Sequence, residues 1–408
     1  MGYLPKLVGF GLCLSLVLLL AGCEENAIPL DLDNTPMKLD TVSFPVNDLI
    51  SYQSPPEMGK SDYLYFGEKN GYKHPYGLIK IDTYDQYDIV NISVFNDSLI
   101  EVDSLNLTLF SVTNTVTDLA TFQLRYFPNG PDSLFNELST HYNNFDQSIA
   151  SDIITTARLQ VDATDTVNTN YILNFSFGPD ILDSFIDTST TNHNRTFLIE
   201  PVNDLNDLFT FYSRENSVDK EPQITVFYRR FSGDSTTVDT LQLVFRTALD
   251  LTVTIPKKLS ARDTTEIAIG QAKGLKTLAF VDFNSFELPP EAVIKTADLI
   301  FYTVEDTASK FTIVSYPIAI VGDYQNFKSY PEDPFDMNLN YFRSTARINN
   351  RFDIETRNFV ADVSDGKTQN YGFKLYASSY NDPFQTVYLY GVDSDSLAPY
   401  LRIQYVEP

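Results

Sequence analysis

The chain is short of the residue types on which many catalytic and metal sites depend. Its 408 residues include two cysteines, three histidines and no tryptophan. Cys13 and Cys23 both precede the body of the chain, so no disulfide can stabilise that body, and its stability must come from packing. His74, His141 and His193 are far apart and form no HxH or HExxH pattern, which argues against a zinc site. No GxSxG nucleophile motif is present either, so we expect a protein that is not an enzyme.

Basic residues are also scarce: 29 lysines and arginines face 54 acids, for a net charge of −25. Such a surface repels phosphate backbones, so nucleic acid is excluded as a partner. It repels anionic lipid headgroups as well, so any hold on a membrane must come from a lipid. The charge serves solubility. The alternative is an acidic surface that binds calcium, with Asp393 and Asp395, or Asp204 and Asp207, as candidate ligands; beyond that we expect no cofactor.

The long apolar run of the chain lies at its N-terminus. Leu7 to Leu20 follows the positive Lys6 and ends in small residues before Cys23, an order typical of a secretory signal peptide over residues 1–22. The run is shorter than the roughly 20 residues that span a bilayer. Leu20-Ala21-Gly22-Cys23 resembles the lipobox of bacterial lipoproteins. The resemblance implies lipidation of Cys23 and cleavage before it.

Residues 23–38 are acidic and without periodicity, so we interpret them as a tether between the lipid and the fold. Glu24-Glu25 resembles the acidic signal that sends lipoproteins of Bacteroidetes to the outer face of the outer membrane. The resemblance implies a cell-surface location in the outer membrane. The alternative is that these glutamates only keep a linker soluble.

The rest of the chain has the pattern of β-strands. Apolar and polar residues alternate in Leu105–Phe110, Leu241–Phe245, Leu299–Tyr302 and Tyr400–Tyr405. A period of two predicts antiparallel strands with one buried face, and turn-rich segments separate them. A short helix is expected only within residues 145–158. We therefore predict an all-β fold of jelly-roll-like antiparallel β-sandwiches.

Five sequence blocks recur in the same order in the two halves of the chain. One pair is Gly67–Lys73 and Gly270–Lys276, both of the form GxxxGxK, whose glycines we expect at hairpin positions with positive φ. Another pair is the two closing segments after Pro222 and Pro399. The repeat predicts two tandem sandwiches, residues 39–232 and 236–408, with an insertion at about 111–160 in the first.

The order of these blocks resembles the DNRLRE-type β-sandwich modules of secreted proteins, which are related to some carbohydrate-binding modules. Lys276–Phe283, Ile294–Tyr302 and Ser396–Tyr405 carry the resemblance best, and the first copy departs from it more. The chain is also similar to uncharacterised lipoproteins of Bacteroidetes. These resemblances imply a sandwich fold and supply no catalytic residue.

Three loops rich in aromatic residues are candidate ligand sites, because sugar rings stack on aromatic faces. The alternative is that the rings pin the loops to the sandwich. The candidate side chains are Tyr72, His74 and Tyr76 in a supposed hairpin tip, Tyr324, Tyr330 and Tyr341 in a second loop, and Tyr380 and Phe384 in a third.

These observations predict a non-catalytic surface lipoprotein that binds glycans or mediates adhesion. The alternative is a structural or accessory subunit of an outer-membrane transport or secretion complex, whose contact would be another protein. A polysaccharide-degrading enzyme is a weaker alternative, since two carboxylates need no local motif. A concave, tyrosine-lined groove with polar groups would favour a glycan, whereas an exposed aromatic patch would favour a protein.

Overall fold

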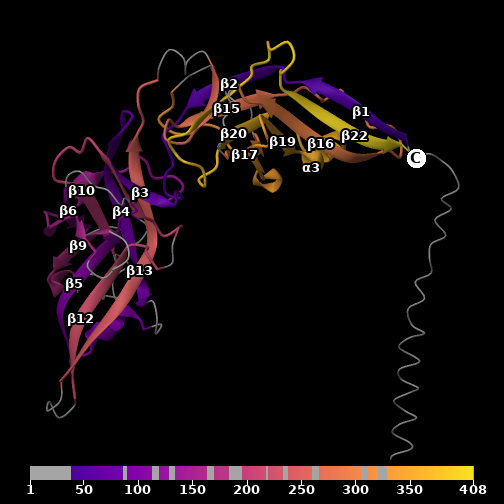
Figure 1. The fold of residues 1–408 in the computed structure, drawn as a ribbon. Coiled ribbons are helices and arrows are strands. Elements are labelled where there is room, and N and C mark those ends of the chain that lie inside the picture. Colours follow the sequence, from indigo (N-terminus) through magenta and orange to yellow (C-terminus); the bar gives the residue numbers. More distant parts are fainter. Residues whose placement is uncertain are drawn as a thin grey trace, which may run out of the picture.

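The chain folds into two β-sandwiches that meet at one end (Figure 1). The computed structural model describes residues 38–85, 90–112, 119–127, 134–162, 170–182, 195–216, 219–232, 238–259, 266–304, 310–319 and 329–407. Antiparallel sheets dominate this part, which confirms the predicted all-β sandwich class. Its α-helix is α3 (Arg357–Ser364). None of the helices in these ranges is long and apolar enough to span a membrane.

One sandwich packs a four-stranded sheet against a seven-stranded sheet. The smaller sheet has the order β1-β22-β16-β19, and the larger runs β18-β17-β20-β15-β14-β21, with β2 paired to β15. We call this body the second sandwich. Its strands are β1 (Lys38–Pro45), β2 (Asp48–Gln53), β14 (Ile267–Gly270), β15 (Leu275–Phe280), β16 (Val293–Tyr302), β17 (Thr312–Pro317), β18 (Arg343–Ala346), β19 (Arg351–Glu355), β20 (Phe373–Ala377), β21 (Thr386–Leu389) and β22 (Tyr400–Glu407).

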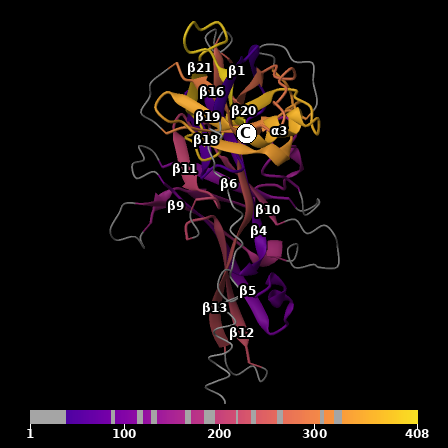
Figure 2. The same ribbon diagram turned by 90° about the vertical axis from the view of Figure 1, so that its right-hand side faces the viewer.

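The other body, the first sandwich, is built from β3 to β13. Strand β13 is 18 residues long and pairs with β12 through its first half and with β4 through its second half, so it joins both layers into one 11-stranded sheet. Figure 2 shows β12 and β13 running together to the far end of this body. The strands are β3 (Tyr63–Lys69), β4 (Tyr72–Asp85), β5 (Ile100–Phe110), β6 (Thr121–Tyr126), β7 (Thr155–Arg158), β8 (Gln160–Val161), β9 (Tyr171–Phe177), β10 (Thr196–Pro201), β11 (Leu208–Tyr212), β12 (Gln223–Phe231) and β13 (Val238–Ile255).

Each sandwich has its own apolar core between its layers. The alternating residues Leu105, Leu107 and Leu109 of β5 are fully buried in the first core, and Leu299 and Phe301 of β16 are fully buried in the second. Burial of apolar surface is the main force that holds such layers together. The period-two pattern in the sequence therefore identified core faces correctly in both halves.

The first strands of the chain belong to the second sandwich, which corrects the expected domain boundaries. Strand β1 pairs along its whole length with β22, and β2 pairs with β15. Figure 1 shows the indigo β1 beside the yellow β22. Conversely β13, which follows the expected boundary at residues 232–236, pairs with β12 and β4. The first sandwich thus spans residues 63–255, and the second combines 38–53 with 267–407.

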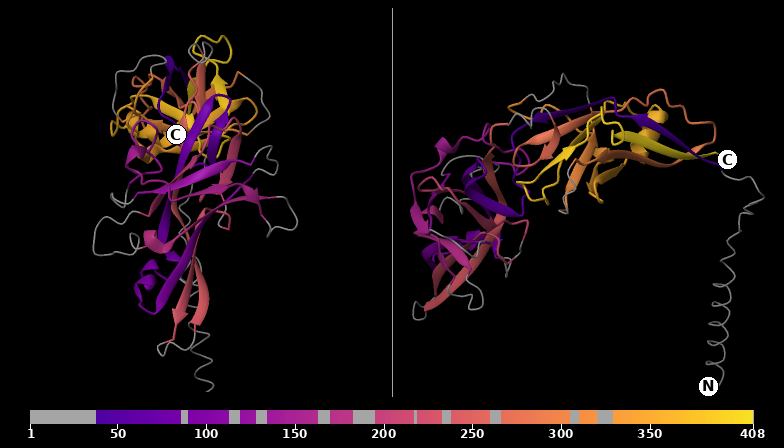
Figure 3. Two further views of the ribbon diagram at one scale, coloured as in Figure 1. Left: turned by 90° about the vertical axis from the view of Figure 1, so that its left-hand side faces the viewer. Right: turned by 45° about the horizontal axis from the view of Figure 1, so that its top comes forward.

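This exchange leaves the two sandwiches with the same strand order. Strand β12 lies between β13 and β5, as β22 lies between β1 and β16. Strand β10 lies between β6 and β4, as β20 lies between β17 and β15. The first sandwich is therefore inserted in the second one, and the chain passes between them twice, once after β2 and once after β13. Figure 3 shows the two bodies joined at this end.

The segment at about 111–160, expected to be an insertion, contains two strands of this shared order, β6 and β7. Strands β6 and β7 pair with each other as β17 and β18 do. Residues 134–150, which precede β7, cover the outer face of the sheet, where Phe135 belongs to one buried cluster with Tyr76, Leu78 and Leu198. The expected helix at 145–158 is instead the 3-10 turn η2 (Gln147–Ile149) and strand β7. In the second sandwich the β17–β18 loop covers the same face through Phe335.

The GxxxGxK pair forms hairpins, as expected, but its members are not all equivalent. Gly67, Gly71 and Gly274 have positive φ values of 99°, 82° and 64°, a region that favours glycine. The fourth, Gly270, ends strand β14. The β3–β4 hairpin is longer than the β14–β15 hairpin. Because Leu78 and Leu278 occupy matching pairing positions, the structural counterpart of Lys276 is Tyr76.

Candidate functional site

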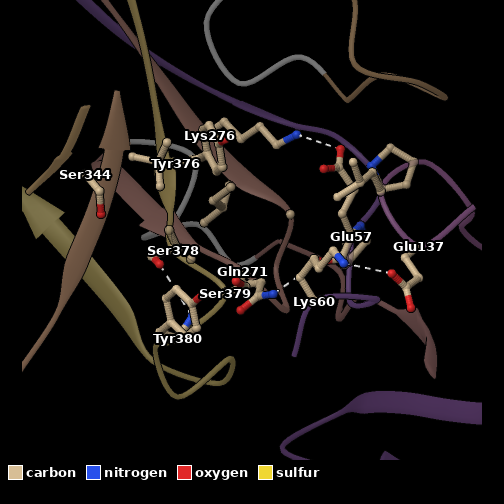
Figure 4. Close-up of a pocket in the computed structure, with 18 of the residues that line it drawn as sticks. Glu57, Lys60, Glu137, Gln271, Lys276, Ser344, Tyr376, Ser378, Ser379 and Tyr380 are labelled. Carbon is tan, nitrogen blue, oxygen red and sulfur yellow. Dashed lines mark hydrogen bonds and ion pairs between the residues drawn. The ribbon is translucent and has the colours of Figure 1, made fainter. Parts of the chain in front are cut away.

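A pocket of about 470 Å³ lies where the two sandwiches meet (Figure 4). Its floor is the outer face of β15, β20 and β17, which presents Lys276, Tyr376 and Val314. One wall comes from the crossing segment Pro55–Lys60, and Glu137 of the first sandwich adds to it. The pocket therefore exists only where both bodies and one of the two chain crossings come together.

The floor and the side opposite the crossing segment carry aromatic and apolar side chains. Tyr376 is half-buried, and its ring stacks on Tyr316 with a centroid distance of 6.0 Å. Tyr380 is 80% exposed, and Phe342 of the same side is also exposed. Leu138 faces them from the first sandwich and is exposed too. The mouth of the pocket thus has apolar surface on both sides, which a monomeric protein rarely exposes without a use.

A buried cluster of charges lies beneath the floor. The carboxylate of Asp333 accepts hydrogen bonds from Lys276 Nζ and Lys374 Nζ, both at 2.6 Å. Its other oxygen accepts from the Tyr52 hydroxyl at 3.2 Å. Lys276 also forms an ion pair with Glu57, 3.1 Å away on the crossing segment. The lysine side chains are only 10% and 3% exposed, so this cluster is largely shielded from water.

Burial and the neighbouring charges shift the pKa values in this cluster in different directions. Burial opposes the charged form of Lys276, but Glu57 and Asp333 outweigh it and raise the pKa of this ammonium. For Lys374, burial and the nearby Lys276 lower the pKa. Burial would raise the pKa of Asp333, yet the two lysines hold it below its usual value. The charged state of each group therefore depends on the others.

The first sandwich has no such cluster at the matching place. The positions of Lys276 and Lys374 correspond to Tyr76 and Leu198, which pack with Leu78 under the covering loop. The fold of this face is therefore compatible with apolar side chains at both positions. The two lysines are a feature of the second copy, on the side that opens to the pocket.

A second charged group begins with Lys60 and Glu137 in the wall of the pocket and continues behind it with Glu215 and Asp250. Lys60 forms ion pairs with Glu137 at 2.8 Å and Glu215 at 3.4 Å, and Glu137 also accepts a hydrogen bond from the backbone N–H of Asp250. Among the described residues, Glu137, Glu215 and Asp250 are the group of acids close enough to share a cation. Burial raises the pKa of Asp250 and of Glu215. The Lys60 ammonium already supplies a positive charge here. The aspartates proposed for calcium are not part of this group.

The first aromatic loop expected to bind ligand is not on the surface. Asn70 and Gly71 form the hairpin tip, and Tyr72, His74 and Tyr76 follow it on strand β4 as buried side chains. The interpretation as an exposed site is therefore wrong for these three residues. They alternate along the outer face of β4. Phe384 of the second sandwich packs on Tyr72 and His74, and the loop before β7 packs on Tyr76, so a local sequence pattern could not show their burial.

Phe384 from the third aromatic loop meets the first loop across the boundary between the sandwiches. Its ring centroid lies 5.5 Å from that of His74, 5.9 Å from Tyr72 and 5.3 Å from Tyr65. Lys69 Nζ lies 4.7 Å above the same ring. The two loops, expected as separate sites, thus form one interdomain contact. Burial lowers the pKa of His74 to about 4.

The remaining candidate residues differ in their surroundings. Tyr330 packs against Tyr52 and Phe335, and Tyr341 donates a hydrogen bond to Asp362 at 2.8 Å, so both hold their loop on the sandwich. Tyr380 alone of the described candidates lines the pocket. Tyr324 and Cys23 lie outside the described residues.

Sequence reasoning missed the residues that build the pocket. In the sequence, Lys276 stands out only as the last residue of a hairpin motif. The residues around Glu57, Lys60 and Tyr376 form no motif that would indicate a binding site. One local signal did exist, because Lys276 is a charged residue within the largely apolar strand Leu275–Phe280; the GxxxGxK match obscures it by aligning Lys276 with Lys73. No family model, no curated protein and no solved structure matches this chain.

Proposed function

We propose that this protein is a non-catalytic surface lipoprotein that binds a glycan in the pocket between its two sandwiches. The observation that carries the proposal is the combination of a concave site of about 470 Å³ with tyrosine rings and polar side chains. Tyr380 offers an exposed face on which a sugar ring can stack, and Gln271 and Ser379 offer hydrogen bonds to its hydroxyls. Cys23 would carry the lipid, and the protein would face outward from the outer membrane.

Catalysis is left out of the proposal because the carboxylates near the pocket have other partners. Glu137 accepts hydrogen bonds from Lys60 and from the Asp250 backbone, and Asp250 accepts one from the Arg214 backbone at 2.9 Å. Glu137 lines the pocket but is only 5% exposed with both oxygens engaged, and Asp250 is fully buried, so neither has a free oxygen at the surface to exchange a proton with a sugar. Binding without turnover is the function that these contacts support.

A glycan array tests the proposal. The soluble chain, residues 26–408, is applied with and without calcium beside Tyr380→Ala, which removes an exposed ring at the pocket mouth. Tyr84→Ala is the matched control, since Tyr84 is 48% exposed on β4, away from the pocket. We expect reproducible binding that Tyr380→Ala weakens and Tyr84→Ala leaves unchanged. A blank array for the unaltered chain would contradict glycan binding.

The exposed rim supports a second candidate, an accessory subunit of an envelope complex that binds another protein. Leu138, Phe342 and Leu339 are 61%, 44% and 66% exposed, and the first two line the pocket from different sandwiches. Apolar side chains of this kind anchor protein partners when they reach into a pocket. Cross-linking in the native envelope from a photoreactive residue at position 342, followed by identification of the linked protein, would favour this candidate if one partner recurs and Leu138→Ser abolishes the link.

A further inference from the structure

We infer that the glycan carries an acidic group, a carboxylate or a sulfate, and that Lys276 binds this group in place of Glu57. The inference rests on the proposed glycan binding and adds the class of sugar. It starts from the charge cluster beneath the pocket floor. Lys276 and Lys374 bring two positive charges, and Asp333 brings one buried negative charge. The fourth member, Glu57, completes neutrality from the crossing segment.

Glu57 is the member that a ligand can replace. Its side chain is 42% exposed, and its carboxylate contacts Lys276 at 3.1 Å. Asp333 is 14% exposed and is held by both lysines and by Tyr52. When Glu57 moves aside, the remaining three groups carry one net positive charge at the pocket floor. An anion that enters the pocket restores neutrality through the same ammonium, with a charge-assisted hydrogen bond.

The comparison of the two sandwiches indicates that the lysines serve binding. The first sandwich places Tyr76 and Leu198 at the matching positions and packs them in an apolar cluster. A buried ion cluster seldom stabilises a fold more than apolar side chains of similar volume do. The lysines of the second sandwich therefore need a reason other than stability. Lys276 supplies one, because it lines the pocket.

The positive charge of Lys276 also lies where the acidic group of a bound sugar could reach it. Lys276 Nζ lies 5.8 Å from the centroid of the Tyr376 ring. This distance is comparable with the width of a pyranose ring. A sugar seated against Tyr376 can therefore direct a carboxylate or sulfate at Nζ while its hydroxyls face Gln271. Because the whole protein is strongly acidic, an anion is attracted only by such a local contact.

The experiment uses an array of matched glycans, each printed as a neutral form, a uronic-acid form and a sulfated form. It compares residues 26–408 with Glu57→Gln and Lys276→Met. Glu57→Gln removes the competing carboxylate from an exposed position, so folding is preserved. Glu287→Gln is the matched control, since Glu287 is also exposed and its change removes the same charge away from the pocket.

We expect hits among the acidic members, binding about tenfold stronger in Glu57→Gln, and no change in Glu287→Gln. Lys276→Met should reduce binding of the acidic glycans to the level seen for the neutral glycans. Preference for carboxylate over sulfate, or the reverse, would identify the group. If neutral forms bind as well as acidic ones and Glu57→Gln has no effect, this inference is wrong while glycan binding stands. If neither the unaltered chain nor Glu57→Gln binds any glycan, both are wrong.

Discussion

Ser51 and Thr252 hold equivalent positions in the two sandwiches. The Ser51 hydroxyl accepts a hydrogen bond from the backbone N–H of Ala268 at 2.9 Å, and the Thr252 hydroxyl accepts one from Tyr65 at 2.8 Å. Ser51 belongs to the second sandwich although it precedes the first, and Thr252 belongs to the first although it follows the expected boundary. The strand exchange ties the two bodies together at two crossings, which keeps the walls of the pocket close.

The exchange predicts which fragments fold. Residues 54–259 contain every strand of the first sandwich, whereas residues 39–232, cut at the sequence repeat, lack β13 and carry β1 and β2 without their partners. We expect the first fragment to unfold in one cooperative transition with urea. The second should show no cooperative transition, because β4 and β12 would each lose a neighbour. Equal cooperativity in the two fragments would contradict the strand assignment.

Asp333→Asn should destabilise the second sandwich by about 3–5 kcal/mol, since it leaves two buried lysines with one exposed acid. The measurement is the free energy of unfolding from denaturant titration. The companion variant adds Lys276→Tyr and Lys374→Leu, the residues of the first sandwich, and should recover most of the loss. A small effect of Asp333→Asn alone would show that the cluster is not electrostatically coupled.

Phe384→Ala should weaken the contact between the sandwiches, because the ring packs on Tyr65, Tyr72 and His74. We expect a loss of about 1–3 kcal/mol in unfolding free energy. Tyr380→Ala, four residues earlier and 80% exposed, should cost less than about 0.5 kcal/mol. Calorimetry on both variants decides the matter: equal melting temperatures would mean that Phe384 contributes little to the interface.

The free energy of unfolding should decrease as the pH is lowered, because His74 is buried in its neutral form. Burial lowers the pKa of its imidazole from 6.5 to about 4. The unfolded state therefore binds a proton near pH 6.5 that the folded state does not accept until near pH 4. The stabilisation is complete above pH 6.5 and is lost progressively as pH falls to 4, by about 3 kcal/mol. His74→Gln should flatten this part of the pH dependence. An unchanged slope would mean that His74 titrates normally.

The sequence predicted the strands well and their partners poorly. Alternation in Leu105–Phe110 and Tyr400–Tyr405 reflects burial of one face, which is a local property. The partner of β1 depends on a strand at the other end of the chain, so no local pattern could identify it. The same holds for the site. His74 and Tyr76 have the composition of a binding loop, and their burial comes from segments far away in sequence.

The central claim is that a glycan binds between the two sandwiches. Hydrogen–deuterium exchange of residues 26–408, with and without a glycan selected on the array, tests where it binds. We predict slower exchange in four segments at once: residues 55–60, 137–138, 270–276 and 376–380, which come from the crossing segment and from both sandwiches. Protection confined to one of the other aromatic loops, or to the far end of either sandwich, would contradict the account.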